Sequence, residues 1–296
     1  MRYAFFPGCS LESTAWDYDV SVRATFAALG VELTDIPEWS CCGSTPAHAS
    51  NASLAVALPV MNLLKAREMG RPVLTACASC YARLRTANHK VKTDPAERER
   101  AGRIVGKPYD GGVPVHHILE ALTKHIGADA IAARVTRPLS GVKVACYYGC
   151  LLTRPPEVVA FEDHEHPMSM DTVMSAAGAE VVDWPYKTEC CGAGLSMTTS
   201  AVVNRLGHNI LAMARQAGAD CLAVACPLCQ VNLDLRQRDA AKAHGSLPET
   251  PVLFVTQLLG LALGLSPEAL GIEGLFVSAN GLVQRLSPAK AAGGAA

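Results

Sequence analysis

Twelve cysteines are the residues of this chain whose type and spacing are best suited to chemistry. Two of them stand side by side in "WSCCGSTP" (39–46), and a second adjacent pair stands in "TECCGAGL" (188–195). Thiolates are ligands for soft metal centres, and thiols also carry out redox reactions. Two adjacent pairs in matching surroundings therefore indicate metal ligation or redox chemistry.

Each half of the chain carries five cysteines in one pattern. The first half reads C-x31-CC-x34-C-x2-C and the second reads C-x39-CC-x34-C-x2-C. The predicted ligands are Cys9, Cys41, Cys42, Cys77 and Cys80 in the first half, and Cys150, Cys190, Cys191, Cys226 and Cys229 in the second. The start, "MRYAFFPGCSLEST", does not resemble a signal peptide. We therefore expect a cytoplasmic protein with reduced thiols, which disfavours a disulfide framework.

Five thiols per half restrict the kind of metal centre. A structural zinc ion and a cubane iron–sulfur cluster each take four ligands, so either would leave one cysteine idle. A cluster whose irons share a bridging cysteine would use all five. Adjacent side chains on an extended strand point to opposite faces. The pairs therefore need a turn, which Gly43 and Gly192 can adopt.

Other sequence blocks recur in the same order, which indicates a tandem duplication. "YAFFPGCSLESTA" (3–15) matches "VACYYGCLLTRPP" (144–156), and "EMGRPVLTACASC" (68–80) matches "QAGADCLAVACPLC" (216–229). Strand-like segments alternate with helix-like segments, which favours α/β folding with parallel sheets. Parallel sheets collect functional groups at the carboxyl ends of their strands, where all the cysteine blocks stand.

We therefore predict two tandem α/β domains with parallel-type sheets, related by a pseudo-twofold axis. Their expected bounds are 1–138 and 139–285, and a flexible tail covers 286–296. Amphipathic helices are predicted at 51–70 and 200–218. The charged segment 88–112 is expected to be a solvated helix and loop.

Composition excludes several classes of function. The net charge of −1 disfavours a nucleic-acid or anionic-membrane surface. The most apolar run (251–265) is shorter than the roughly 20 residues that span a bilayer, so we predict a buried strand passing into a helix. No GxGxxG motif is present around Gly192, and we expect no flavin or nucleotide on this chain.

The two remaining cysteines, Cys146 and Cys221, align with Phe5 and Pro72 of the first half. Because reduced cysteine behaves as a small apolar residue, we expect both to pack in the core.

Several histidines and one arginine also allow two interpretations, one functional and one structural. His164 and His166 could bind metal or transfer protons, but their polar surroundings favour a solvated loop. His116 and His117 are expected to pack or to cap a helix. Arg154 could attract an anionic substrate, and a surface ion pair is the commoner outcome.

The doubled cysteine pattern resembles the CCG-domain family, specifically the B subunit of heterodisulfide reductase. "YYGCLLTRP" and "CPLCQVNLDLRQ" read like that protein, and the resemblance covers nearly the whole chain. It implies two non-cubane [4Fe-4S] clusters, each held by the five cysteines of one half, with the substrate between them. The clusters themselves would be catalytic, with no protein residue assigned.

The resemblance further implies an oxidoreductase acting on thiols and disulfides within a complex. The partners would be a ferredoxin-like C subunit and a flavoprotein A subunit, and the substrate a small disulfide or carrier-bound thiol. One alternative is a bacterial version that oxidises carrier-bound sulfur. Others are an electron-transfer subunit of a quinone- or succinate-linked reductase, and a non-catalytic zinc or iron–sulfur scaffold.

Overall fold

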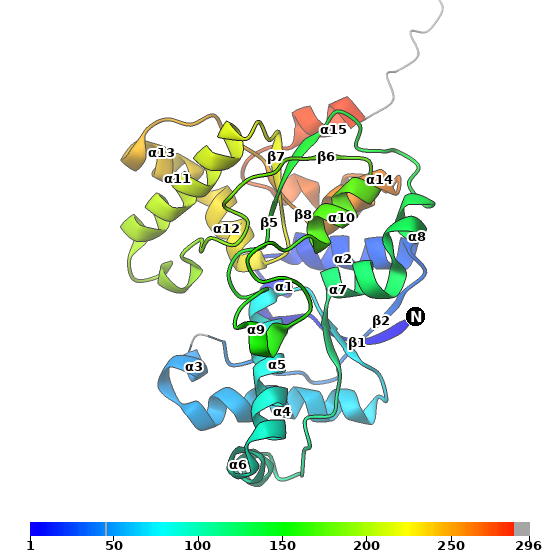
Figure 1. The fold of residues 1–296 in the computed structure, drawn as a ribbon, viewed down its shortest axis with the longest axis vertical. Helices are drawn as coiled ribbons and strands as arrows, with labels where there is room; N and C mark the ends of the chain where they lie inside the picture. Colours follow the sequence, from blue (N-terminus) through cyan, green and yellow to red (C-terminus); the bar gives the residue numbers. More distant parts are fainter. Residues whose placement is uncertain (45, 287–296) are drawn as a thin grey trace, which may run out of the picture.

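A computed structural model of the chain describes residues 1–44 and 46–286 (Figure 1). The first half runs through β1 (Arg2–Phe6), α1 (Gly8–Leu11), α2 (Trp16–Ala28), β2 (Glu32–Asp35), α3 (Pro46–Ser50), α4 (Ala52–Glu68), β3 (Val73–Thr75), α5 (Ala78–Thr93), α6 (Pro95–Val105), β4 (Val115–His117), α7 (Ile118–Glu120), the π-helix η1 (Ala121–Ile126) and α8 (Ala128–Ala132).

The second half repeats this order with changes at its ends. It runs through β5 (Lys143–Tyr147), α9 (Pro156–Val159), α10 (Ser169–Ala176), β6 (Glu180–Val181), η2 (Ala193–Leu195), α11 (Ser200–Gln216), β7 (Cys221–Val224), α12 (Pro227–Leu235), α13 (Gln237–His244), β8 (Val252–Phe254), α14 (Val255–Ala262), η3 (Glu268–Leu270), η4 (Ile272–Gly274) and α15 (Asn280–Leu286). The three η elements here are 3-10 helices.

Each half forms a four-stranded sheet in which every pairing is parallel. The orders are β2-β1-β3-β4 and β6-β5-β7-β8, so equivalent strands occupy equivalent places. The register also repeats, since Ala4 pairs with Val73 and the equivalent Ala145 pairs with Leu222. The predicted α/β class and the duplication are confirmed.

The central strands are short and mainly apolar. All residues of β3 and β7 are buried, and β1 and β5 are buried after their first residue, as expected for sheets covered by helices on both faces. One continuous hydrophobic core extends through both halves. The run 251–265 forms β8 and α14, and every residue of α14 is buried, which confirms the predicted strand passing into a helix. Among the described residues, no helix has the length and hydropathy needed to cross a membrane.

Helices α2 and α14 join the two halves. The Tyr18 ring stacks on Phe254 with centroids 3.7 Å apart and planes 4° apart. Ser21 Oγ lies 2.8 Å from Thr256 Oγ1, and Thr25 Oγ1 donates to the Thr256 carbonyl at 2.9 Å. Because these polar groups are buried and paired with each other, they fix the position of one helix on the other.

The longer first gap of the second half forms a bridge to the first half. Residues 151–168 include α9, which Figure 1 draws beside α5. Tyr81 Oη donates to the Val159 carbonyl at 3.1 Å, and Arg85 Nε donates to the Val158 carbonyl at 3.0 Å. The extra residues therefore hold the halves together.

The segment 88–112 follows the predicted solvated helix and loop over most of its length, since most of its residues are exposed. It contains the end of α5 and all of α6, in which Ala101 is the one buried residue, and a few of its other side chains reach the core. Tyr109 is 3 % exposed, and its hydroxyl donates to Asn88 Oδ1 at 2.7 Å. Of the predicted tail (286–296), only Leu286 belongs to the described residues, and it ends α15.

Candidate metal centres

The five predicted ligands of the first half meet at the carboxyl ends of its strands. Cys9 lies in α1 after β1, and the adjacent pair lies in the loop after β2. Cys77 caps the N-terminus of α5, and Cys80 lies in its first turn. The Sγ atoms of Cys42 and Cys80 are 3.4 Å apart. This arrangement follows from the parallel topology, which brings all strand ends to one edge.

The second half repeats this arrangement. Cys191 Sγ lies 3.4 Å from Cys229 Sγ, which matches the first half, and Cys150 Sγ lies 3.9 Å from Cys190 Sγ. Cys226 caps the N-terminus of α12. The inner thiols are buried, whereas Cys190 is exposed, as is its counterpart Cys41. In each group of five cysteines, three thiols are therefore buried and the first cysteine of the adjacent pair is exposed to solvent.

Glycines shape both sites. Gly43 and Gly192 have φ values of +77° and +78°, and each donates its N–H to the sulfur two residues earlier, at 3.4 and 3.3 Å. This left-handed turn is the one that the adjacent cysteines were predicted to need. A Cβ atom on Gly8 would lie 2.8 Å from Cys80 Sγ, and one on Gly149 would lie 3.0 Å from Cys229 Sγ. Only glycine leaves room for these sulfurs.

Thiols within each site share protons. The hydrogen bond with Cys80 lowers the pKa of Cys42 to about 7, and the hydrogen bond from Cys150 lowers the pKa of Cys190 to about 6. The partner thiols respond in the opposite direction: hydrogen bonds to Cys42 and Cys190, together with burial, raise the pKa values of Cys80 and Cys150. Metal binding requires thiolate, so such sharing lowers the cost of deprotonation.

The two sites meet between the halves. The thiols of Cys77 and Cys226 are hydrogen-bonded to each other, which lowers the pKa of Cys226 and raises that of Cys77. His117, which is fully buried, lies beside them. Its Nδ1 accepts from the Leu119 N–H, and its Nε2 therefore donates to the Ala76 carbonyl at 3.0 Å. Burial lowers its pKa to about 4, which keeps the ring neutral.

The donor set fits an iron–sulfur cluster in each half. Within residues 1–44 and 46–286, no three His, Cys, Asp or Glu side chains are arranged to hold a single metal ion. A cluster distributes its thiolates over several irons and needs no such convergence. Arg83 Nε, beside the first site, is buried without a hydrogen-bond partner in the described chain, as expected where an anionic group would bind.

The residues predicted to stand apart from the ligands do so. Cys146 and Cys221 lie in β5 and β7 with no exposed surface, which confirms core packing. His164 and His166 are exposed in a loop, as predicted. Arg154 Nη2 forms an ion pair with Glu165 Oε1 at 3.0 Å, which is the commoner outcome named for it.

His116 and His117 also follow their prediction. His117 ends β4 and caps α7, and His116 Nδ1 lies 3.1 Å from Glu120 Oε2. The position of His117 between the two sites was not predicted, because it depends on how the halves pack.

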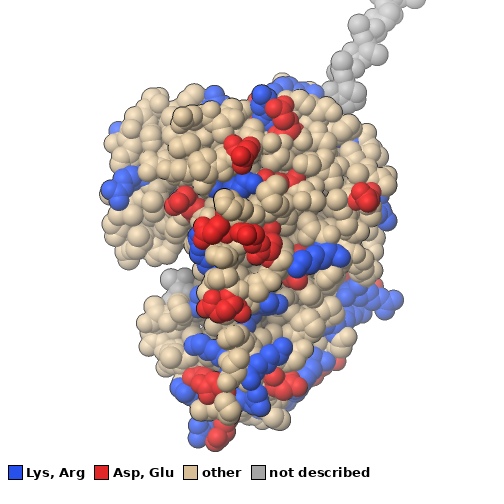
Figure 2. Space-filling view, viewed as in Figure 1, with Lys and Arg blue, Asp and Glu red and all other residues tan. Residues whose placement is uncertain are grey.

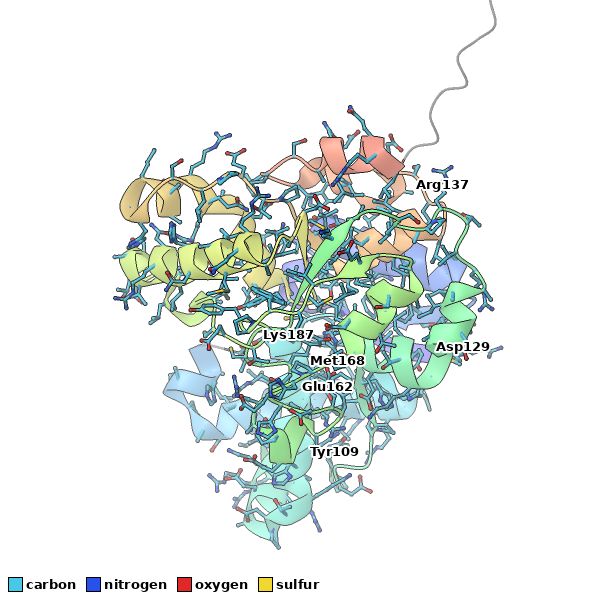
Figure 3. All side chains as sticks on the ribbon, turned by 45° about the horizontal axis from the view of Figure 1, so that its top comes forward. Tyr109, Asp129, Arg137, Glu162, Met168 and Lys187 are labelled. Carbon is cyan, nitrogen blue, oxygen red and sulfur yellow. The ribbon has the colours of Figure 1, made fainter. Side chains whose placement is uncertain are left out.

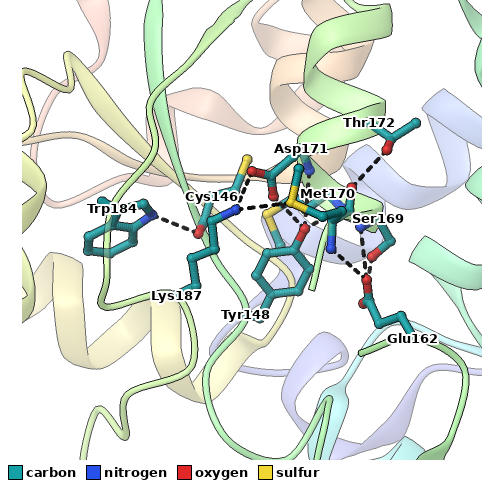
Figure 4. Close-up of polar contacts among 10 residues, drawn as sticks. Cys146, Tyr148, Glu162, Ser169, Met170, Asp171, Thr172, Trp184 and Lys187 are labelled. Carbon is teal, nitrogen blue, oxygen red and sulfur yellow. Dashed lines mark hydrogen bonds and ion pairs between the residues drawn. The ribbon is translucent and has the colours of Figure 1, made fainter. Parts of the chain in front are cut away.

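Sequence reasoning missed a buried polar network in the second half (Figure 4). Lys187 Nζ pairs with Asp171 Oδ1 at 2.5 Å, and Tyr148 Oη donates to Asp171 Oδ2 at 2.6 Å. Lys187 also donates to the Met168 sulfur at 3.4 Å, and Figure 3 shows these two side chains close together. The sequence offered one signal, since Tyr148 and Lys187 lie two and three residues before cysteines of the second site.

The family model for the cysteine-rich CCG domain matches the chain twice, at residues 3–85 and 144–234. The chain belongs to the CCG family. Both matches include all five cysteines of their half. This CCG protein is 34% identical over 278 residues to the B subunit of the "Ferredoxin/F(420)H(2)-dependent CoB-CoM heterodisulfide reductase" of Methanosarcina acetivorans, with 92% of each chain covered.

Two further comparisons define its relationships. The CCG protein is 34% identical over 284 residues to the "8-methylmenaquinol:fumarate reductase membrane anchor subunit" of Wolinella succinogenes, covering 95% of this chain and 99% of that one. A crystal structure of a hypothetical protein from Helicobacter pylori shares the fold at a TM-score of 0.75 and 13% identity, covering 94% of this chain and 52% of that one. The CCG protein thus resembles iron–sulfur oxidoreductase subunits, including the B subunit of heterodisulfide reductase.

Proposed function

We propose that each half binds one non-cubane [4Fe-4S] cluster through its five cysteines, and that the chain performs thiol–disulfide chemistry between them. The contact between Cys77 and Cys226 carries this proposal, because it places one five-cysteine site directly against the other. A bound pair of clusters would supply two electrons, which is what cleavage of a disulfide requires.

The chain contributes the surroundings of this chemistry. The N–H groups of Gly43 and Gly192 point at sulfurs, and hydrogen bonds to ligand sulfurs help to set the potential of iron–sulfur clusters. The surface is hollowed between α3 and α11, the helices that follow the two cysteine pairs (Figure 2). We propose this notch as the entrance for a disulfide or a carrier-bound thiol.

A complex is part of the proposal. Relatives of this chain are named as subunits of heterodisulfide reductases. By that analogy a ferredoxin-like C subunit and a flavoprotein A subunit would deliver or remove electrons in the cytoplasm. The notch is the part of this chain where the substrate would meet both sites.

The Wolinella relative supports a second candidate function. Its name places it in a quinol:fumarate reductase, and it covers as much of this chain as the heterodisulfide reductase relatives do. In that case the sites would only pass electrons, and no sulfur substrate would meet the clusters.

Iron and acid-labile sulfide analysis of anaerobically purified protein tests the clusters. We expect about eight irons per chain, since each of two clusters holds four. Zinc without iron would contradict the proposal. Adding small disulfides or thiols to the dithionite-reduced protein then separates the two functions. A change in the cluster spectrum supports sulfur chemistry, whereas a response only to menaquinone analogues supports electron transfer.

A further inference from the structure

Equivalent helix positions beside the two sites carry different side chains. Arg83 on α5 and Asn232 on α12 each stand six residues after the first cysteine of their CxxC. Asn232 Nδ2 donates to the Cys191 carbonyl at 3.3 Å and lies 3.8 Å from Cys191 Sγ. Cys42 is the counterpart of Cys191, so this helix position faces the second cysteine of the adjacent pair in each half.

Arg83 brings a positive charge to the first site. Its Nη1 contacts His48 Nδ1 at 2.8 Å, and its charge lowers the pKa of His48, so His48 is no counterion. No described Asp or Glu forms an ion pair with Arg83, and the charge that acts on it is that of Cys42. The guanidinium is half-buried with one buried N–H unpaired, a costly arrangement unless an anionic group lies beside it.

A second difference in charge between the two halves also makes the surroundings of the second site more negative than those of the first. The residue before the adjacent pair is Ser40 in the first half and Glu189 in the second. The Glu189 carboxylate acts on Cys190 in the direction that disfavours further negative charge. Three cations also lie on the side of the second site, and each is held by another group: Arg154 pairs with Glu165, Lys187 pairs with Asp171, and Arg236 donates to the Ser196 carbonyl at 3.1 Å.

These charges affect oxidised and reduced clusters differently. A reduced cluster carries one more negative charge, so a nearby cation favours reduction and raises the potential, whereas a nearby carboxylate lowers it. Arg83 is half-buried and Glu189 is exposed to solvent, which screens its charge. The larger contribution therefore comes from Arg83.

We infer that the two clusters have unequal reduction potentials, with the first-half cluster higher because Arg83 lies beside Cys42 where the second half has Asn232. A single electron entering the protein then resides in the first half, and the second-half cluster is filled last. This inference rests on the proposed function, since it requires both clusters.

The test is an anaerobic redox titration of the iron-loaded chain followed by electron paramagnetic resonance. We expect two one-electron reductions whose midpoint potentials differ by at least about 59 mV, which corresponds to a tenfold preference of a single electron for the first-half cluster. Cys191→Ser, with the first cluster alone, should titrate at the higher step. Arg83→Asn should lower that step, and Arg83→Lys, which keeps the charge, should retain most of it.

Substitutions in the second half test the same idea at the equivalent positions. Asn232→Arg should raise the lower step, and Glu189→Ser should raise it by a smaller amount. A chain without iron contradicts the proposed function. A chain with eight irons and unmoved steps in Arg83→Asn, or in both second-half variants, overturns only the present inference. If Arg83→Asn loses its cluster, the second-half variants still decide the outcome.

Discussion

The two halves hold the same five cysteines on the same strand order, yet the packing around β1 differs from that around β5. In the first half, Phe5 and Pro7 fill the space beside the sheet. At the equivalent places the second half has Cys146 and Tyr148, and Tyr148 joins the buried ion pair of Lys187 and Asp171. The two halves therefore share the five cysteines and the strand register, while the packing around the strands differs.

This difference separates the features expected to serve the proposed metal centres from those that serve each half's own core. The left-handed turns at Gly43 and Gly192, and the close approach of Gly8 and Gly149 to sulfurs, occur in both halves. The buried ion pair occurs in the second half alone among the described residues. Shared features are thus expected to control iron binding, and unshared ones the stability of one half.

The largest effect is expected from the proposed cysteine ligands. Cys42→Ser and Cys191→Ser should each remove one cluster and reduce the iron content from about eight to about four per chain. Cys221→Ser should keep all the iron, because this thiol is buried in β7 away from both sites. Metal analysis of the three variants checks this, and equal losses from all three would show that the ligands are misassigned.

A smaller loss of iron is expected from the glycine beside the first site. Gly8→Ala places a Cβ 2.8 Å from Cys80 Sγ and also strains a φ of +71°. Gly30→Ala is the matched control, since its φ is +74° and nothing lies within 4 Å. Both should lose about 1 kcal/mol of stability from backbone strain. Only Gly8→Ala should lose iron, and similar iron contents would show that the close approach is unimportant.

The buried ion pair should affect stability in the second half. Lys187→Met leaves the Asp171 carboxylate without its cation and should cost about 3–5 kcal/mol. Lys143→Met breaks an exposed pair with Glu180 at 3.4 Å and should cost at most about 1 kcal/mol. Denaturant unfolding measures both, and comparable losses would contradict a special role for the buried pair.

The smallest effect concerns the contact between the halves. Burial raises the pKa of Asp17, whose Oδ2 accepts from Gln257 of α14, to about 6. Because the folded pKa exceeds the unfolded value of 3.8, this carboxyl group stabilises the fold most at low pH. Its contribution is lost as the pH rises from about 4 to about 6, by about 2 kcal/mol after allowing for its partial exposure.

Asp17→Asn should therefore reduce the decline in the free energy of unfolding between pH 4 and pH 7. Unfolding curves at several pH values check this, with the exposed Asp129→Asn as the control. Parallel declines in the wild type and in Asp17→Asn would show that Asp17 does not titrate in this range.

The sequence predicted the features that depend on local pattern or on repetition. Strand–helix alternation predicted both sheets, and alignment of the halves correctly placed Cys146 and Cys221 in the core. It did not predict the contact between Cys77 and Cys226, or the bridge from α9 to α5. Both depend on how the halves pack, which periodicity does not encode. Tyr109 was also missed, because its charged neighbours concealed a single buried aromatic ring.

The bridge made by residues 151–168 makes the contact between the halves asymmetric: the first half supplies the donors and the second half supplies the acceptors. Two copies of the first half set face to face would leave the Tyr81 hydroxyl and the Arg85 guanidinium without the carbonyls of Val159 and Val158. A homodimer built from one half would lack these acceptors on both sides. The two repeats are therefore not interchangeable. If the chain were cut between them, each first-half fragment would have to pair with a second-half fragment and could not pair equally well with another first half.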